Sequence, residues 1–137
     1  MLVGGLSQSR SGGALRLYKK SYWDPLNLSM LKSDTIARYV FSLAVNAGVS
    51  PSGKALQRAI NFIKPFGEKK LVIDGLVGPV TIHEVNRYST THFEALLVSL
   101  RGHQFEHYKD IVDSDPQYGK KYIRGWLKRL VRWKIRG

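Results

Sequence analysis

Hydrophobic positions between Ile36 and Ile63 follow the repeat of two successive amphipathic helices. In the first helix, apolar residues recur at steps of three and four and so share one stripe: Ile36, Val40, Leu43, Ala44 and Ala47. Ser33 or Asp34 is suited to cap its start, and Gly48 is suited to end it in a left-handed conformation. Pro51 then lies in the first turn of the second helix, whose inward stripe is Ala55, Leu56, Ala59, Ile60 and Ile63. The two helices form a hairpin that needs further helices to cover its apolar stripes.

Before the hairpin, the pattern predicts a short helix and a packed loop. The helix is expected over residues 14–22, and Pro25 is expected to stop it because proline disfavours a helical residue before it. The loop over residues 26–32 carries hydrophobic side chains that are expected to fill the core: Leu26, Leu28, Met30 and Leu31. Residues 1–13 are rich in Gly and Ser, which favours a flexible arm or a segment that docks elsewhere.

After the hairpin, one extended segment and three helices are expected. Residues 71–73 suit a short strand or extended segment, and Asp74-Gly75 suits a tight turn in which glycine supplies the positive φ. Three helices follow, over residues 79–85, about 93–112 and about 119–135. A capping box of Thr91 and Glu94 opens the second of them. Inward positions on this helix are Phe93, Leu96, Leu97, Leu100, Tyr108 and Ile111.

These elements predict an all-α fold. We expect a small orthogonal bundle of about five or six helices with one short extended excursion near residues 71–75. The chain has 137 residues, which suits one domain with a substantial core. That domain is placed at residues 14–137.

Charge is the strongest feature of the composition. The chain has 22 Lys and Arg against 10 Asp and Glu, a net charge of +12. Such a chain is drawn to polyanions, which include nucleic acid, anionic wall polymers, phospholipid head groups and acidic proteins. The absence of cysteine excludes disulfides and thiolate metal sites. No apolar run is long enough for a transmembrane segment or a secretory signal, so we expect synthesis in the cytoplasm of a host cell.

Four segments of the chain resemble, in order, segments of one known family. They are residues 18–25 (YKKSYWDP), residues 40–48 with 56–59 (VFSLAVNAG, LQRA), residues 74–81 (DGLVGPVT) and residues 124–129 (RGWLKR). They are similar to "IYrxxYWdp", "FDxAVNxG … LQRAL", "DGxiGPxT" and "kGWlxRv" of the phage-type muramidases of glycoside hydrolase family 108, also known as the secretion-activator family. The second of these segments begins the family's C-terminal half, which is expected to bind peptidoglycan. The resemblance implies a small lysozyme-like helical bundle.

The same resemblance implies no active site in this chain. Members of the family carry their catalytic acid in a Glu-Gly-Gly helix, followed by a "DPGGxTxxGIT" stretch, and the sequence contains neither. Ser42 also stands where the family has Asp. We therefore expect no catalytic residue here and no cofactor.

Candidate chemistry from individual side chains is sparse. Asp34, Asp74 and Glu94 fit a helix cap, a turn and a capping box, rather than a general acid for glycoside hydrolysis. His103 and His107 share one helix face and, with Glu106, form the string H-x-x-E-H. A solvated or packed helix face explains this string better than a metal site, so no metal is expected.

The C-terminal stretch combines basic and aromatic residues. From Lys120 to Arg136 there are several Lys and Arg and no acid, around an apolar stripe of Tyr122, Ile123, Trp126, Leu127, Leu130 and Val131. The apolar side is expected to pack on the core, which leaves the basic face for an acidic partner or wall polymer. With the resembling segments, it supplies the candidate binding residues: Trp23, Asn46, Arg58, Trp126, Lys128, Arg132 and Trp133.

The leading interpretation is a phage-derived, muramidase-like domain that is non-catalytic alone. Its expected partner is peptidoglycan or an anionic wall polymer, or phage structural proteins in a virion or tail, so it would act in a virion or at the bacterial cell wall. In an alternative, a partner chain supplies the catalytic Glu and the pair is an active muramidase. A second alternative is a basic nucleic-acid-binding protein, although Lys54 occupies a position that a helix-turn-helix motif keeps apolar.

Overall fold

The computed structural model describes residues 8–132, with side chains described for residues 13–131. Within that range it contains six α-helices: α1 (Gln8–Tyr18), α2 (Asp34–Ala47), α3 (Val49–Ile63), α4 (Pro79–Thr91), α5 (Phe93–Ser114) and α6 (Pro116–Arg132). A π-helical turn, η2 (Lys19–Trp23), and two 3₁₀ turns, η3 (Asp24–Leu26) and η4 (Leu28–Met30), join α1 to α2. No β-strand occurs in the described residues, so the predicted all-α class is confirmed. Residues 71–73 belong to the loop between α3 and α4.

The α2–α3 hairpin forms as its pattern predicts. The Ile36 amide donates to Ser33 Oγ over 3.2 Å, which caps α2. Gly48 ends α2 and precedes α3 with a φ of +102°, a backbone angle that glycine adopts without strain. The predicted stripes are buried except for Ala47 and Ile63 at the helix ends, which are half-buried.

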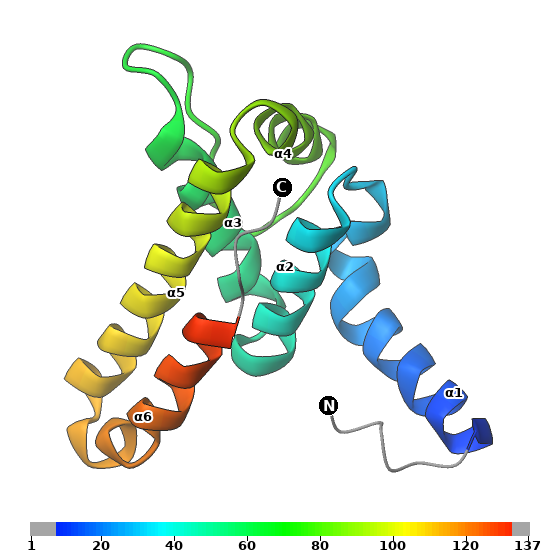
Figure 1. Cartoon of the computed structure of the whole chain (residues 1–137), viewed down its shortest axis with the longest axis vertical. Helices are drawn as coiled ribbons and strands as arrows, with labels where there is room; N and C mark the ends of the chain where they lie inside the picture. The colour runs from blue at the N-terminus through cyan, green and yellow to red at the C-terminus, as the bar shows by residue number, and fades with distance from the viewer. Residues whose placement is uncertain (1–7, 133–137) are drawn as a thin grey trace.

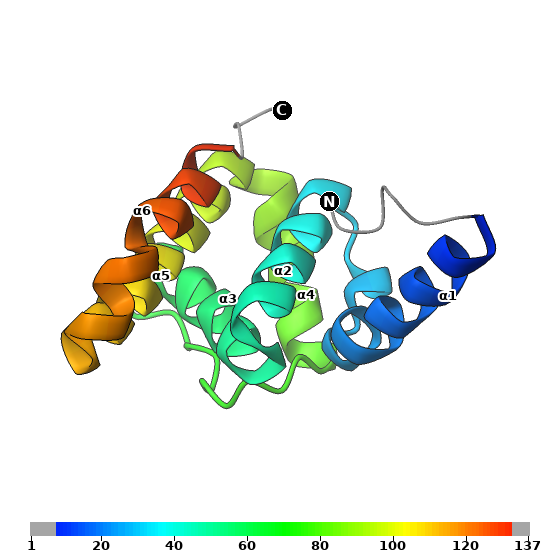
Figure 2. The ribbon, with the colours of Figure 1, turned by 90° about the horizontal axis from the view of Figure 1, so that it is seen from below.

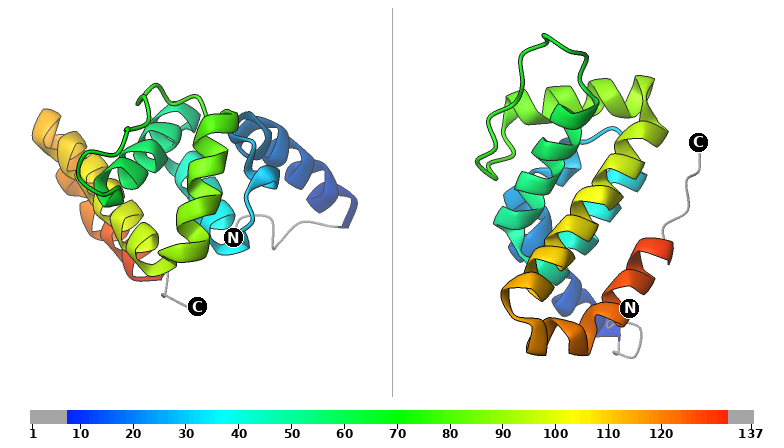
Figure 3. Two further views of the ribbon diagram at one scale, coloured as in Figure 1. Left: turned by 90° about the horizontal axis from the view of Figure 1, so that it is seen from above. Right: turned by 90° about the vertical axis from the view of Figure 1, so that its left-hand side faces the viewer.

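The helices pack around α2, α3 and α5 (Figure 1). α3 and α6 lie on opposite sides of α5, and α4 crosses one end of the group (Figure 3). Figure 2 shows α1 on the flank opposite α6, with α2 between them. The crossing of α4 agrees with the expected orthogonal arrangement.

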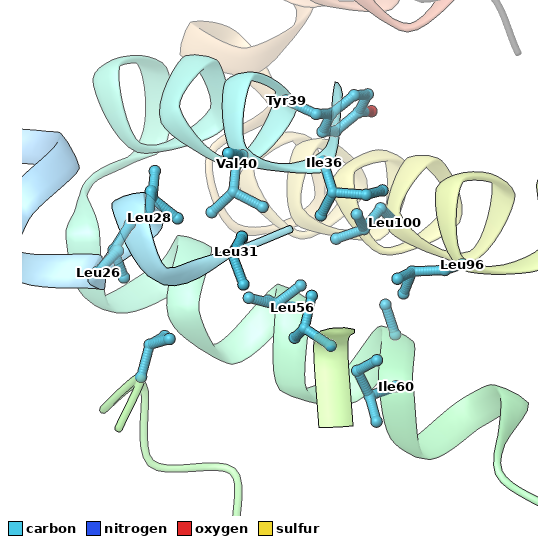
Figure 4. Packing of buried hydrophobic residues seen from close by; sticks show 14 of the residues in the cluster. Leu26, Leu28, Leu31, Ile36, Tyr39, Val40, Leu56, Ile60, Leu96 and Leu100 are labelled. Carbon is cyan, nitrogen blue, oxygen red and sulfur yellow. The ribbon is translucent and has the colours of Figure 1, made fainter. Parts of the chain in front are cut away.

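The core lies where the turns before α2 meet α2, α3 and α5 (Figure 4). Its fully buried side chains include Leu26 and Leu28 from the turns, Ile36 and Val40 from α2, Leu56 and Ile60 from α3, and Leu96 and Leu100 from α5. Leu26, Leu28 and Leu31 fill the core as expected, whereas Met30 is 65% exposed. The prediction for Met30 is wrong because successive residues of a tight turn cannot all face the same way.

The start of the chain differs from the prediction. α1 begins at Gln8 and not near residue 14, so half of the expected arm is helical, and residues 1–7 lie outside the described residues. Pro25 does not stop the helix, because Asp24 keeps helical angles of −64° and −41°. Pro25 instead lies at the start of the 3₁₀ turn η3, where a missing amide breaks no bond. The helical backbone therefore runs through η2, where Tyr22 and Trp23 pack against the core, and past Pro25 to the end of η3.

The predicted capping box of Thr91 and Glu94 is also wrong. α4 extends to Thr91, well past the predicted end at residue 85, and Thr91 Oγ1 donates to the Arg87 carbonyl over 2.8 Å. The hydroxyl therefore bonds within α4. His92 precedes α5 without a side-chain cap.

The last helix begins earlier than expected. Asp115 Oδ1 accepts a hydrogen bond from the Tyr118 amide over 3.2 Å, and Pro116 is the first residue of α6. An aspartate cap followed by proline is a regular helix start. Val131 is 78% exposed and Tyr122 is 41% exposed, so their predicted places in the inward stripe are wrong.

Candidate functional site

The loop of residues 64–78, between α3 and α4, is fixed to α3 by one buried glutamine. Gln57 is 1% exposed. Its Nε2 donates to Asp74 Oδ1 over 3.0 Å and to the Leu76 carbonyl over 3.1 Å. Its Oε1 accepts from the amides of Asp74 and Gly75 over 3.1 and 2.8 Å. One side chain of α3 thus holds the turn at Asp74-Gly75 against that helix.

Two asparagines fix the same loop at other points. Asn61 Nδ2 donates to the Leu71 carbonyl over 2.9 Å, and Asn61 Oδ1 accepts from the Leu71 amide over 2.7 Å. Asn27 Nδ2 donates to the Val77 carbonyl over 2.6 Å. These contacts, with those of Gln57, supply the backbone partners that a loop without regular structure otherwise takes from water.

The turn also lies directly on α3. A Cβ added at Gly53 would be 2.3 Å from the Gly75 carbonyl oxygen, which is closer than any carbon can approach. Gly75 itself has a φ of +78°, as the sequence predicts. Two glycines therefore allow the loop backbone to touch the helix.

Side chains on the outer side of this fixed structure are exposed, although they are apolar. Phe62 is 76% exposed and Phe66 is fully exposed. Three aliphatic side chains share this property: Val72, Leu76 and Val80. Large apolar side chains gathered on a surface mark an interaction site more often than scattered ones do.

These side chains line two adjoining cavities of about 570 and 640 Å³. The first is lined by Val72, Leu76 and Val80, and the second by Phe62 and Phe66. Both are lined by Lys64, Glu68 and Lys70, so they form one surface. We call this surface the loop groove and define it by Phe62, Lys64, Phe66, Glu68, Lys69, Lys70, Val72, Leu76, Val80 and Glu84.

A network of ion pairs lies within the loop groove. The Lys64 side chain is 3% exposed and contacts the carboxylates of Glu84 and Glu68. Arg87 reaches the same two carboxylates, over 2.5 Å to Glu68 and 3.3 Å to Glu84, and its guanidinium lies 4.9 Å from the Tyr88 ring centre. The hydrogen bond from Arg87 holds the pKa of Glu68 below its usual range, with Lys64 adding to the effect.

The pKa of Asp74 is likewise lowered, first by the hydrogen bond from the Leu76 amide and then by that from Gln57. Glu68 and Asp74 therefore stay ionised near neutral pH. Neither carries the proton that a general acid must donate to a glycosidic oxygen.

Residues 52–131, which run from α3 into α6 and include the whole loop groove, match the family described as "Predicted Peptidoglycan domain". The chain belongs to this family. No curated protein matches the chain. The match confirms the peptidoglycan-domain part of the sequence resemblance, whereas the link to glycoside hydrolase family 108 and the missing catalytic segment stay predictions.

The family places the peptidoglycan domain at the bacterial cell wall, with peptidoglycan as its partner. Across residues 8–132, no helix combines the length and the apolar character that crossing a lipid bilayer requires.

The candidate residues chosen from the sequence do not meet in this peptidoglycan domain. Trp23 is half-buried, and its Nε1 donates to Ser29 Oγ over 2.7 Å while its ring lies 5.5 Å from that of Phe41. Asn46 is exposed near the end of α2. Arg58 is exposed on α3 and lines a separate cavity beside α5. Trp23 thus has a packing role in η2.

The described C-terminal candidates, Trp126 and Lys128, lie on α6, away from the loop groove. Trp126 stacks with Tyr108 of α5 at 5.3 Å and with Tyr122 at 5.9 Å between ring centres. Lys128 is exposed. Arg132 ends α6 with its side chain outside the described part of the chain, and Trp133 lies outside the described residues. Trp126 therefore joins α6 to α5, as the apolar stripe predicts.

The histidine pair gains no third ligand. His103 Nδ1 lies 2.8 Å from the Ser99 carbonyl, and the described residues contain no group of three or more His, Asp or Glu side chains suited to a metal.

Sequence reasoning missed the residues of the loop groove. One signal was present for Phe62, which falls between the inward positions Ile60 and Ile63 and so off the apolar stripe of α3. Phe66, Lys69 and Lys70 stand between turn residues, where the sequence gives no direction for a side chain.

Proposed function

We propose that this domain binds the glycan of peptidoglycan in the loop groove. The observation that supports the proposal is the exposure of two aromatic rings, Phe62 near the end of α3 and Phe66 in the adjoining loop. Gln57, Asn61 and Asn27 hold the part of that loop that follows Phe66. An exposed aromatic ring offers a flat apolar face, and sugar rings have apolar faces of similar size. Ligand sites in proteins commonly pair such apolar walls with a few polar groups that fix orientation.

The lysines beside the aromatic rings add the second element of recognition. Lys69 and Lys70 are exposed, and neither has an ion-pair partner among the described residues. Peptidoglycan carries carboxylates on its peptides, which an exposed ammonium attracts. The groove thus combines stacking surfaces for sugar rings with positive charge for the acidic groups attached to them.

Binding without cleavage is the proposed role of the groove. The ionised state of Glu68 and Asp74 supports this role, since glycoside hydrolysis needs a protonated carboxyl group. The resemblance of residues 18–25 and 40–59 to phage-type muramidases supports a finer version, a phage-derived domain in a virion or tail. In the alternative version a partner chain supplies the catalytic glutamate. The purified chain alone should leave a peptidoglycan suspension intact in both versions, and only in the alternative should adding that partner clear it.

Retention on insoluble peptidoglycan tests the proposal. Phe66→Ser and Lys70→Gln should each weaken retention, by about fivefold for the aromatic ring as a contact near the centre of the site. Lys128→Gln is the matched control, because it removes one charge from an exposed lysine on α6, outside the groove. Affinity is measured by co-sedimentation at constant salt.

Two results would contradict the proposal. If Phe66→Ser and the wild-type chain are retained equally on peptidoglycan, the loop groove is not the binding site. A loss confined to Lys128→Gln would move binding to the basic face of α6, the surface first expected from the sequence.

A further inference from the structure

A second groove runs between α3 and α5, with a cavity of about 410 Å³. We call it the α3–α5 groove. Its polar lining comprises Lys54 and Arg58 from α3, and His103, Glu106, His107 and Asp110 from α5.

The two sides of this groove carry opposite charges. Lys54 and Arg58 are one helical turn apart on α3, and Glu106 and Asp110 are one turn apart on α5. Among the ion pairs within 4.0 Å in residues 13–131, none joins these two sides. Elsewhere on the surface opposite charges do meet, as in Arg38 with Asp34 and Lys109 with Asp113. Here the cavity keeps them apart, so each side is available to a ligand.

His103 adds a hydrogen-bonding group to the same groove. Its Nδ1 lies 2.8 Å from the Ser99 carbonyl oxygen, which only accepts, so Nδ1 carries the proton and donates. In the neutral ring Nε2 is then an acceptor. A ligand amide or ammonium group is the kind of donor that this nitrogen takes.

The α3–α5 groove adjoins the loop groove. The ring of Phe62, which lines the loop groove, meets the ring of His103 edge to face at 6.1 Å between centres. Arg58 and Phe62 are also one turn apart on the exposed side of α3. A ligand that lies against Phe62 is therefore within reach of both surfaces. Figure 3 (right) shows α3 and α5 side by side below the loop.

We propose that the α3–α5 groove binds the peptide branch of peptidoglycan at a point that carries both a carboxylate and a free amino group. This inference rests on the proposed function, since it assigns the loop groove to the sugars. Arg58 can pair with a carboxylate through two parallel hydrogen bonds, and Glu106 with Asp110 faces the ammonium group. The carboxylates of α5 repel phosphate, which sets this groove apart from a nucleic-acid site despite the net charge of +12.

The test compares two probes on the full chain by calorimetry or NMR titration. One probe is a disaccharide–tetrapeptide whose peptide contains a diamino acid with a free amino group, and the other is the same disaccharide without its peptide. The wild-type chain should bind the first more tightly, by about tenfold for two exposed charge contacts. Arg58→Gln and Asp110→Asn should each reduce this preference while leaving affinity for the peptide-free disaccharide unchanged.

A complementary experiment modifies the peptide of the first probe instead of the protein. Acetylation of the free amino group should lower affinity for the wild-type chain but not for Asp110→Asn, and amidation of the carboxylates should do so for the wild-type chain but not for Arg58→Gln. Arg38→Gln, an exposed arginine on α2, is the control and should keep the full preference. Circular dichroism of each variant verifies the fold.

Distinct failures separate the two proposals. Equal affinity of the wild-type chain for both probes, or an unchanged preference in Arg58→Gln and Asp110→Asn, overturns the peptide assignment and leaves the loop groove standing. Absence of binding to both probes and to intact peptidoglycan overturns the proposed function, and the peptide assignment with it.

Discussion

At the scale of single residues, Gln57 has the largest structural role in the candidate site. A primary amide offers two donors and an acceptor with two lone pairs, and all of them are used. Besides Asp74 and Leu76, its Nε2 lies 3.3 Å from Thr81 Oγ1 at the start of α4. Gln57 belongs to the segment LQRA and its partners to DGLVGPVT, so two segments that are distant in sequence form one hydrogen-bonded unit.

Replacing Gln57 with leucine should destabilise the fold. Gln57→Leu leaves the buried amide of Gly75 and the part-buried amide of Asp74 without their acceptor, which should lower the free energy of unfolding by about 2–3 kcal/mol. Gln117→Leu, at an exposed position on α6, is the control and should change stability little. Urea unfolding followed by circular dichroism measures both, and equal stability of Gln57→Leu and the wild type would show that water replaces the lost bonds.

At the scale of elements, the α5–α6 pair depends on one close approach. A Cβ at Gly119 would lie 2.6 Å from Val112 Cα, whereas a Cβ at Gly125 would meet nothing within 4 Å. Both glycines are inside α6. A substitution at Gly119 therefore tests how α6 packs on α5, and the same substitution at Gly125 tests helix propensity alone.

Alanine at these two positions should have opposite effects. Gly125→Ala should raise the free energy of unfolding by about 0.5–1 kcal/mol, because alanine loses less backbone entropy in a helix. Gly119→Ala should lower it by about 1–3 kcal/mol, because the added methyl forces α6 away from α5. Thermal unfolding of the two variants gives the comparison, and a gain in stability at both sites would mean that the helices separate without penalty.

The elements also show what could be predicted from the sequence. The α2–α3 hairpin and the burial of Leu96, Leu97 and Leu100 follow from local periodicity and local caps. The capping-box prediction was wrong because α4 extends through Thr91. The four residues of the motif do not determine where the preceding helix ends. The loop groove could not be predicted, because long-range contacts of Gln57 and Asn61 decide which loop side chains face outward.

At the scale of the whole molecule, ion pairs join the end of α3, the loop and α4. Lys64 follows α3, Glu68 lies in the loop, and Glu84 and Arg87 lie on α4. The lowered pKa of Glu68 means that folding favours its ionised form. Its stabilisation is present above the pKa of the unfolded chain and is lost as the pH falls through the lower folded value.

Stability should therefore be constant near neutral pH and fall in acid. The fall should begin below about pH 4.5, the ordinary pKa of a glutamate, where the unfolded chain binds protons that the folded chain excludes. Glu68→Gln should make the melting temperature less dependent on pH in this range, with a smaller residual slope from Asp74. Melting temperatures between pH 3 and 7 at fixed ionic strength test this, and an unchanged slope in Glu68→Gln would assign the acid sensitivity to other carboxylates.

The side-chain hydrogen bonds that hold residues 71–77, from Gln57, Asn61 and Asn27, have a thermodynamic consequence for recognition. A segment that already holds its bound shape loses little conformational entropy when a ligand arrives, so more of the contact energy appears as affinity. Association should then resemble lock-and-key docking rather than folding upon binding. Removing the one bond whose side chain lines neither cavity, as in Asn27→Gly, would weaken the complex without changing a residue of the loop groove.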